Sequence, residues 1–166
     1  MAHARLGPLL VSTGEAKAAV PSLRIAARDL EAKGFADKAV SLHMQLAAID
    51  PGDLWAWETA SRLHVSRGRT ADAVKVLALG ASRQGGADGR AKAIKLLRDA
   101  LALSGDDSEL LLALARRLRQ AGETVEARAL IERALERTEG PARKRARWTA
   151  FVLFPGLGTL WRWLRA

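Results

Sequence analysis

The stretch that decides the fold is Gly34–Ala39, with the sequence GFADKA, which separates two apolar, helix-favouring segments. Two further stretches have the same spacing of glycine and alanine: Gly68–Ala73 (GRTADA) and Gly122–Ala127 (GETVEA). The first two glycines lie 34 residues apart. Glycine ends a helix readily in the left-handed conformation, and an alanine five residues later lets the next helix approach closely. The repeated spacing therefore predicts a series of helix–turn–helix units.

The first unit, about 20–53, joins a helix at about 20–33 to a helix at about 36–49. Its apolar residues recur at three- and four-residue intervals, as on the buried face of an amphipathic helix. Pro51 closes the unit because proline cannot continue a helix. With glycine, alanine and proline at these offsets, the sequence resembles the tetratricopeptide repeat family. The resemblance implies an all-α fold, a right-handed α-solenoid of about three helical pairs with a curved binding face.

The second unit, about 54–86, follows in the same phase. Asp53 is the expected cap of its first helix, and Trp57 lies on the expected buried stripe. In the family pattern a large residue, often tryptophan, occupies the position of Trp57. Gly85 stands where the first unit has its closing proline.

The period is then interrupted, because 54 residues separate the glycines of the second and third units. Twenty more residues than one repeat suffice for one helix and its loop. We expect an extra inserted helix at about 87–104, after a flexible joint at Gly85–Gly89. The third unit, about 108–139, begins with an expected capping box formed by Asp106 and Glu109.

These units predict a repeat domain over residues 1–139, followed by a docking segment over residues 140–166. An unrelated helical bundle is the alternative to the repeat interpretation. The abundance of Ala, Leu and Arg and the scarcity of Thr, Ile and Phe favour helices over strands. The chain has no cysteine, which removes disulfides and thiolate metal sites. Without a convincing secretory signal, we expect the protein in the cytoplasm.

The net charge of +9 is unevenly distributed along the chain. Residues 1–139 carry 21 basic and 18 acidic side chains, whereas the remaining residues carry six basic side chains and no acidic one. Five of the eight Trp and Phe residues also lie in the last 19 positions. The docking segment is therefore expected to act through basic and aromatic side chains: Arg143, Lys144, Arg145, Arg147, Trp148, Phe151, Phe154, Trp161 and Trp163.

Two interpretations of this segment remain open. It folds back as a helix that covers the end of the last repeat, or it docks on a membrane surface, a membrane protein or a subunit. We favour docking slightly, because the stretch from Trp148 to Leu160 is too apolar for the outer face of a cap. As a helix, the 14 residues from Trp148 to Trp161 reach about 21 Å, short of the roughly 30 Å core of a bilayer. The expected membrane position is thus peripheral, on the cytoplasmic face.

In the family, the first helix of each repeat lines the concave groove. Arginine occupies one family position in all three units, and further arginines lie one turn away. Trp55 is expected to face the same groove as an aromatic anchor. The resemblance implies a groove that binds a protein partner, in particular an acidic or C-terminal peptide segment. The expected groove residues are Arg24, Arg28, Trp55, Arg62, Arg116 and Arg119.

The simpler interpretation is that these arginines only solvate an exposed face and pair with Asp29, Glu31 and Glu58. The asparagines of the family's peptide-carboxylate clamp are missing, so that specificity is not implied here.

Catalysis and nucleic-acid binding are disfavoured. The three histidines lie neither at metal-ligand spacing nor beside a nucleophile motif, and His43 and His64 are expected to pack within helices or lie on their surface. We expect no enzyme activity, no metal and no cofactor. The aromatic residues follow the basic cluster as a block and do not interleave with it, unlike the aromatics of a nucleic-acid-binding surface. The sequence thus favours an interaction adaptor, with peripheral lipid association as the alternative.

Overall fold

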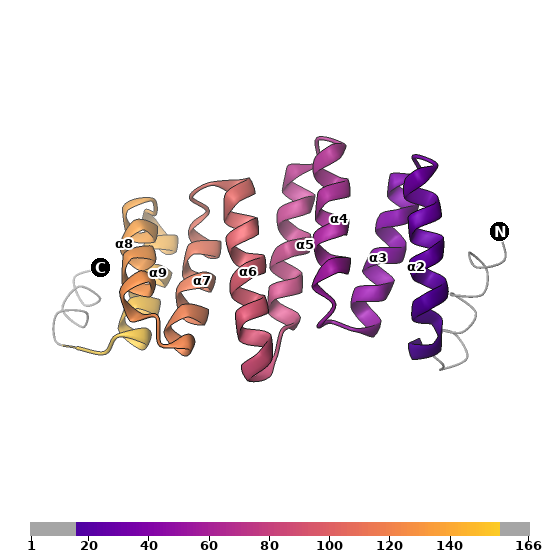
Figure 1. Ribbon diagram of the computed structural model, residues 1–166. Coiled ribbons are helices and arrows are strands. Elements are labelled where there is room, and N and C mark those ends of the chain that lie inside the picture. Colours follow the sequence, from indigo (N-terminus) through magenta and orange to yellow (C-terminus); the bar gives the residue numbers. More distant parts are fainter. Residues whose placement is uncertain (1–15, 157–166) are drawn as a thin grey trace. The chain divides into compact units, whose positions relative to one another are not determined.

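The computed structural model describes residues 16–156, which contain eight α-helices and no strand. The all-α prediction is confirmed. The chain divides between Gln84 and Gly85 into two compact units, each larger than one of the helix–turn–helix units predicted from the sequence. We call the part up to Gln84 the first unit of the structure and the part from Gly85 the second unit. In chain order the helices are α2 (Ala16–Ala32), α3 (Ala36–Ile49), α4 (Leu54–Ser66), α5 (Thr70–Arg83), α6 (Gly86–Ser104), α7 (Ser108–Ala121), α8 (Thr124–Glu136) and α9 (Gly140–Leu153) (Figure 1).

The three predicted turns share one geometry. Gly34, Gly68 and Gly122 have φ angles of 76°, 72° and 90°, in the left-handed region that side chains disfavour. In each turn the residue after the glycine donates its amide to a carbonyl five residues earlier, at 2.9 Å, and the glycine amide donates to a carbonyl three residues earlier. This paired bonding satisfies carbonyls that the end of the helix would leave without partners.

The alanines that follow the turns are fully buried. Ala39, Ala73 and Ala127 are each 0% exposed, as the repeat interpretation predicts. A larger side chain at any of these positions would separate the two helices of the pair. Glycine and alanine together therefore set both the reversal of the chain and the spacing of the helices.

The first unit consists of two helical pairs, α2 with α3 and α4 with α5, and α3 also packs against α4. Leu23, Leu46 and Trp57 lie in its core. The carbonyl of Pro51 accepts a hydrogen bond from Trp57 Nε1 at 3.0 Å and another from Gln84 Nε2 at 2.5 Å. The loop between the pairs is thus tied to the last residue of the unit.

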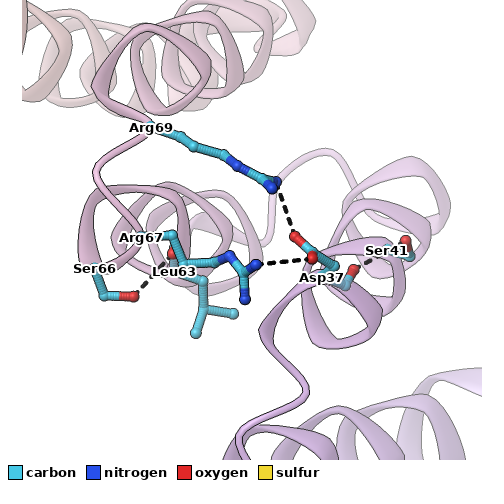
Figure 2. A network of polar contacts seen from close by, with 6 residues as sticks. All are labelled: Asp37, Ser41, Leu63, Ser66, Arg67 and Arg69. Carbon is cyan, nitrogen blue, oxygen red and sulfur yellow. Dashed lines mark hydrogen bonds and ion pairs between the residues drawn. The ribbon is translucent and has the colours of Figure 1, made fainter.

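A polar network joins the two turns of this unit on its surface (Figure 2). Asp37, in the first turn of α3, forms ion pairs with Arg67 at 3.1 Å and with Arg69 at 2.9 Å. Both arginines lie in the turn between α4 and α5. All three side chains are more than a third exposed, so each pair contributes at most about 1 kcal/mol. The network supports the arrangement of the two pairs but does not determine it.

The second unit contains the inserted helix, the third helical pair and the first part of the docking segment. Helix α6 packs against α7, α7 pairs with α8, and α9 packs against both α7 and α8. The observed bounds of α6 match those of the predicted inserted helix to within one residue at the N-terminal end. Helix α9 begins at the predicted start of the docking segment and belongs to this unit by its packing.

Two predicted boundaries were wrong. Helix α2 spans Ala16–Ala32, whereas its start was predicted near residue 20, so Pro21 lies inside it. Proline there removes one backbone hydrogen bond without ending the helix. The joint is also shorter than predicted, because Gly86–Gly89 forms the start of α6. Gly89 lies buried on the packed face of that helix, where its small size allows close contact.

Neither side chain that was predicted to cap a helix makes a capping hydrogen bond. Asp53 precedes α4 but makes no capping hydrogen bond, because its carboxylate accepts from Arg24. Helix α7 is capped by Asp107, whose Oδ1 accepts from the amides of Glu109 at 2.9 Å and Leu110 at 3.0 Å. Asp106, the predicted cap, forms ion pairs with two arginines of α8 and its end, Arg133 and Arg137.

Replacing Asp107 with alanine removes both capping bonds, and we expect the second unit to lose about 1 kcal/mol in its free energy of unfolding. Serine keeps an acceptor, so Asp107→Ser should retain most of the stability. Urea unfolding followed by circular dichroism measures both variants. An equal loss for serine and alanine would contradict the capping assignment.

Candidate functional site

The first unit gathers the predicted groove residues around Trp55, in the first turn of α4. The guanidinium carbons of Arg24 and Arg28, one turn apart on α2, lie 5.5 and 5.6 Å from the centroid of the Trp55 ring. At these distances the cations are attracted to the face of the indole. Arg24 also donates to Asp53 at 2.5 Å. Trp55 therefore joins α2 to α4 through stacked cations.

A partly buried polar pair, His43 with Glu31, lies next to this cluster. His43, on α3, is 0% exposed, and its Nε2 lies 2.7 Å from Glu31 Oε1 at the end of α2. The edge of the His43 ring meets Trp55 with the centroids 4.9 Å apart. Arg62 of α4 approaches the other oxygen of Glu31 at 3.6 Å. Three helices thus contribute to one connected set of polar and aromatic contacts.

The contact between His43 and Glu31 was not predicted from the sequence. A signal was present, because His43 falls between Ala39 and Ala47 on the apolar stripe of its helix. A polar residue on such a stripe needs a buried partner. The partner itself lies 12 residues earlier on another helix, and helical spacing alone does not identify it.

Arg28 differs from its neighbours in what it binds. Arg24 has Asp53 and Arg62 has Glu31, whereas Arg28 makes no ion pair or side-chain hydrogen bond within residues 16–156. Its side chain is exposed and rests on the indole. Asp29, one of the carboxylates considered as a partner for the arginines, pairs instead with Lys33 at 2.7 Å, which lowers the pKa of this exposed carboxyl.

A cavity of about 530 Å³ lies beside Arg24 in the same unit. Its apolar wall comes from α2 and α3, and charged side chains of both signs surround it. The lining residues are Lys17, Val20, Arg24, Leu46, Ile49, Asp50 and Asp53. Because Arg24 borders both the cavity and the Trp55 ring, the two features form one continuous surface.

The predicted groove arginines of the second unit have a different environment. Arg116 donates to Thr149 Oγ1 at 2.9 Å, and Arg119 Nε donates to the carbonyl of Leu153 at 3.2 Å. Both acceptors belong to α9. The Phe154 ring also lies 5.5 Å from the guanidinium of Arg119 and 4.5 Å from that of Arg128. These arginines hold the first part of the docking segment against α7 and α8.

Helix α9 buries only part of its surface. Ala146 and Thr149 face the core of the unit, whereas Trp148 is 51% and Val152 56% exposed. Trp148 and Phe151 stack with their ring centroids 5.9 Å apart. Among the basic residues, Arg143, Lys144 and Arg145 are exposed and Arg147 is half-buried. The predicted docking residues Trp161 and Trp163 lie outside the described residues.

Within residues 16–156, no group of three His, Asp or Glu side chains could hold a metal ion. Of the helices between residues 16 and 156, none is both long and apolar enough to cross a membrane. The described surface offers exposed cations and aromatic rings, the cavity of about 530 Å³ beside Arg24, and smaller cavities of about 300 and 160 Å³.

Comparison with known proteins supports the repeat interpretation. Residues 90–147, from α6 into α9, match the tetratricopeptide repeat family. This matched segment makes up about a third of the chain. It contains the third predicted unit, so the predicted resemblance is confirmed. A search of curated protein sequences returned no match.

Solved structures of tetratricopeptide repeat proteins are similar to the chain at low identity. Two crystal structures of MamA give TM-scores of 0.43 and 0.42 at 19% and 18% identity. They cover 84% and 88% of this chain and 88% and 86% of their own. The crystal structure of YrrB, a TPR protein with an unusual peptide-binding site, gives 0.33 at 12% identity and covers 87% of this chain and 91% of its own.

Replacing His43 with alanine should destabilise the first pair of repeat helices by about 2–4 kcal/mol. The substitution leaves a cavity in the core and removes the partner of Glu31. His64→Ala is the matched control, because His64 is only half-buried and should cost less than half as much. Urea unfolding of both variants measures the difference, and equal small losses would contradict the role given to His43.

Proposed function

We propose that this protein is a non-catalytic adaptor or assembly subunit that binds a protein partner through the α2/α4 face. This face consists of Arg24, Arg28, Trp55 and Arg62. The partner contributes an acidic segment. The observation that carries the proposal is the exposed guanidinium of Arg28, which is stacked on Trp55 and pairs with no carboxylate of the described chain.

Stacking prepares Arg28 for a ligand. The indole holds one face of the guanidinium, and the donors at its edge stay available for a carboxylate. Because the side chain is already placed, a ligand loses less conformational entropy on ordering it. A bidentate carboxylate–arginine pair is also among the stronger hydrogen-bonded contacts in proteins.

The neighbouring pairs favour an acidic ligand further. Asp53 occupies Arg24, and Glu31 lies at 3.6 Å from Arg62, beyond normal hydrogen-bonding distance. A carboxylate on the partner can replace either contact. The cavity beside Arg24 then accommodates an aliphatic side chain of the same segment against Val20, Leu46 and Ile49.

Arg116 and Arg119 contribute less in this proposal. Their donors are engaged by Thr149 and by the Leu153 carbonyl, so a ligand would have to displace α9. We therefore assign the principal contact to Arg28 on the α2/α4 face and give Arg116 and Arg119, in the second unit, only a secondary role in binding.

A second candidate function concerns the docking segment, residues 140–166. In this second candidate function, the docking segment attaches the protein to a membrane surface, a membrane protein or a subunit on the cytoplasmic side. The alternative to the adaptor function is that lipid attachment through this segment is the protein's main activity. The exposed Trp148 and Val152 on α9 favour it, because the outer helix of a repeat domain is normally polar.

Reversing the charge of Arg28 should weaken binding of an acidic peptide by about 10- to 100-fold, the usual effect of losing a charge-assisted contact. The probe is a fluorescein-labelled octaglutamate peptide, and fluorescence anisotropy measures its affinity for the full chain. Lys75→Glu is the matched control, because Lys75 is an exposed cation on α5 and makes the same change in net charge. Equal effects of Arg28→Glu and Lys75→Glu would contradict a specific site.

Replacing Asp53 with asparagine should strengthen the binding of octaglutamate, whereas the Arg28 substitution should weaken it. It removes the carboxylate that competes for Arg24, and it removes no capping bond because Asp53 makes none. Affinity for octaglutamate should rise about three- to tenfold, as expected for one more available partly exposed cation. The same anisotropy assay measures it, and an unchanged or lower affinity would show that Arg24 takes no part in binding.

A further inference from the structure

The outward face of α9 combines two kinds of side chain in a fixed order. Lys144, Trp148 and Phe151 are spaced four and three residues apart, so they share one face of the helix. Ala146 and Thr149 lie on the opposite, buried face. The basic residues of α9 lie in its first eight positions and the aromatic ones in its last six. The face thus has a cationic half and an aromatic half.

The cations surround the aromatic line and do not converge on one point. At 100° per residue, Arg143 and Arg145 fall on the two flanks of the face, with Lys144 between them. No acidic residue occurs anywhere in 140–166, and Glu109 of α7 lies 3.6 Å from Arg145 in an ion pair whose two side chains are both more than two thirds exposed. Such a spread fits a plane of diffuse negative charge better than a single carboxylate, which a converging pair of donors would bind.

The helix is held in place at its C-terminal half. Arg116 binds Thr149, Arg119 binds the Leu153 carbonyl, and the Phe154 ring packs on Arg119 and Arg128. These contacts keep the buried side of α9 on α7 and α8 and leave its aromatic side outward. A ligand for this face meets a formed helix and does not have to fold it.

We propose that the outward face of α9 docks the second unit on an anionic lipid surface. The cations Arg143, Lys144 and Arg145 contact lipid phosphates, while Trp148 and Val152 enter the interfacial layer. Tryptophan suits this layer because its ring is apolar and its N–H is polar. The proposal rests on the second candidate function. Of the three partners named there, a membrane surface, a membrane protein and a subunit, it selects the membrane surface.

The test is co-sedimentation of the full chain with phosphatidylcholine vesicles, prepared with and without phosphatidylglycerol. We expect binding only where phosphatidylglycerol is present. Lys144→Glu/Arg145→Glu should weaken it at least tenfold, because each lost cation removes attraction and each added anion repels the surface. Trp148→Ser should weaken binding at both low and high salt, since its contribution is not screened.

Lys75→Glu/Arg83→Glu is the matched control. It makes the same change in net charge on exposed residues of α5, so it should reduce binding only slightly. Lys144→Gln/Arg145→Gln tests charge removal without reversal, and circular dichroism checks that α9 variants stay folded. Equal losses in the α5 and α9 variants would overturn the proposal, because binding would then follow net charge alone.

Absence of vesicle binding by the wild-type chain would also overturn it. If the α9 variants then lost a defined protein that co-purifies with the wild type, docking through a protein contact would stand and the lipid assignment would fall. Octaglutamate binding reports separately on the α2/α4 face, so failure here leaves that proposal unaffected.

Discussion

The structure depends on one local constraint, the left-handed glycine that stands five residues before a fully buried alanine. The glycine lets the chain reverse while its amide and the next one satisfy carbonyls at the end of the helix. The alanine lets the returning helix pack at short range. A single pair formed in this way still exposes an apolar side, so it must pack on a neighbouring pair. Packing of successive pairs then creates the surfaces on which function depends.

The first-unit surface shows how binding residues arise from this packing. Arg24 and Arg28 on α2 meet Trp55 on α4 because α3 lies against both helices. His43 fills the space beneath the ring and takes Glu31 as its partner. The same contacts that hold the helices together leave the Arg28 guanidinium exposed and stacked on Trp55. Stability and recognition therefore share residues here.

The features that sequence predicted well are the local ones. Glycine and alanine spacing and the apolar stripes follow from positions a few residues apart, and the helix bounds agree with them except at the start of α2 and in the joint before α6. The failures involve competition between partners. Asp53 and Asp106 are both suitable caps by position, yet each pairs with arginine from another helix. The cap of α7 moves to Asp107, and helical spacing gives no means of foreseeing that choice.

The candidate site shows the same division. Periodicity placed Trp55 and the arginines on the first helix of each unit, but could not tell which arginines would be engaged. Arg116 and Arg119 are occupied because α9 packs beside them, and α9 is far from both in the sequence. Only the packed structure singles out Arg28. The tail likewise divides into a helix that packs and a face that stays exposed.

The central claim is that the α2/α4 face recognises acidic segments through Arg28 and Trp55. The most direct measurement is a two-dimensional ¹H–¹⁵N NMR titration of the full chain with unlabelled octaglutamate. We expect the largest shifts at the Trp55 indole and at amides of α2 and α4, with saturation at increasing peptide concentration. Shifts confined to α9, or small shifts spread over all basic residues without saturation, would contradict the account.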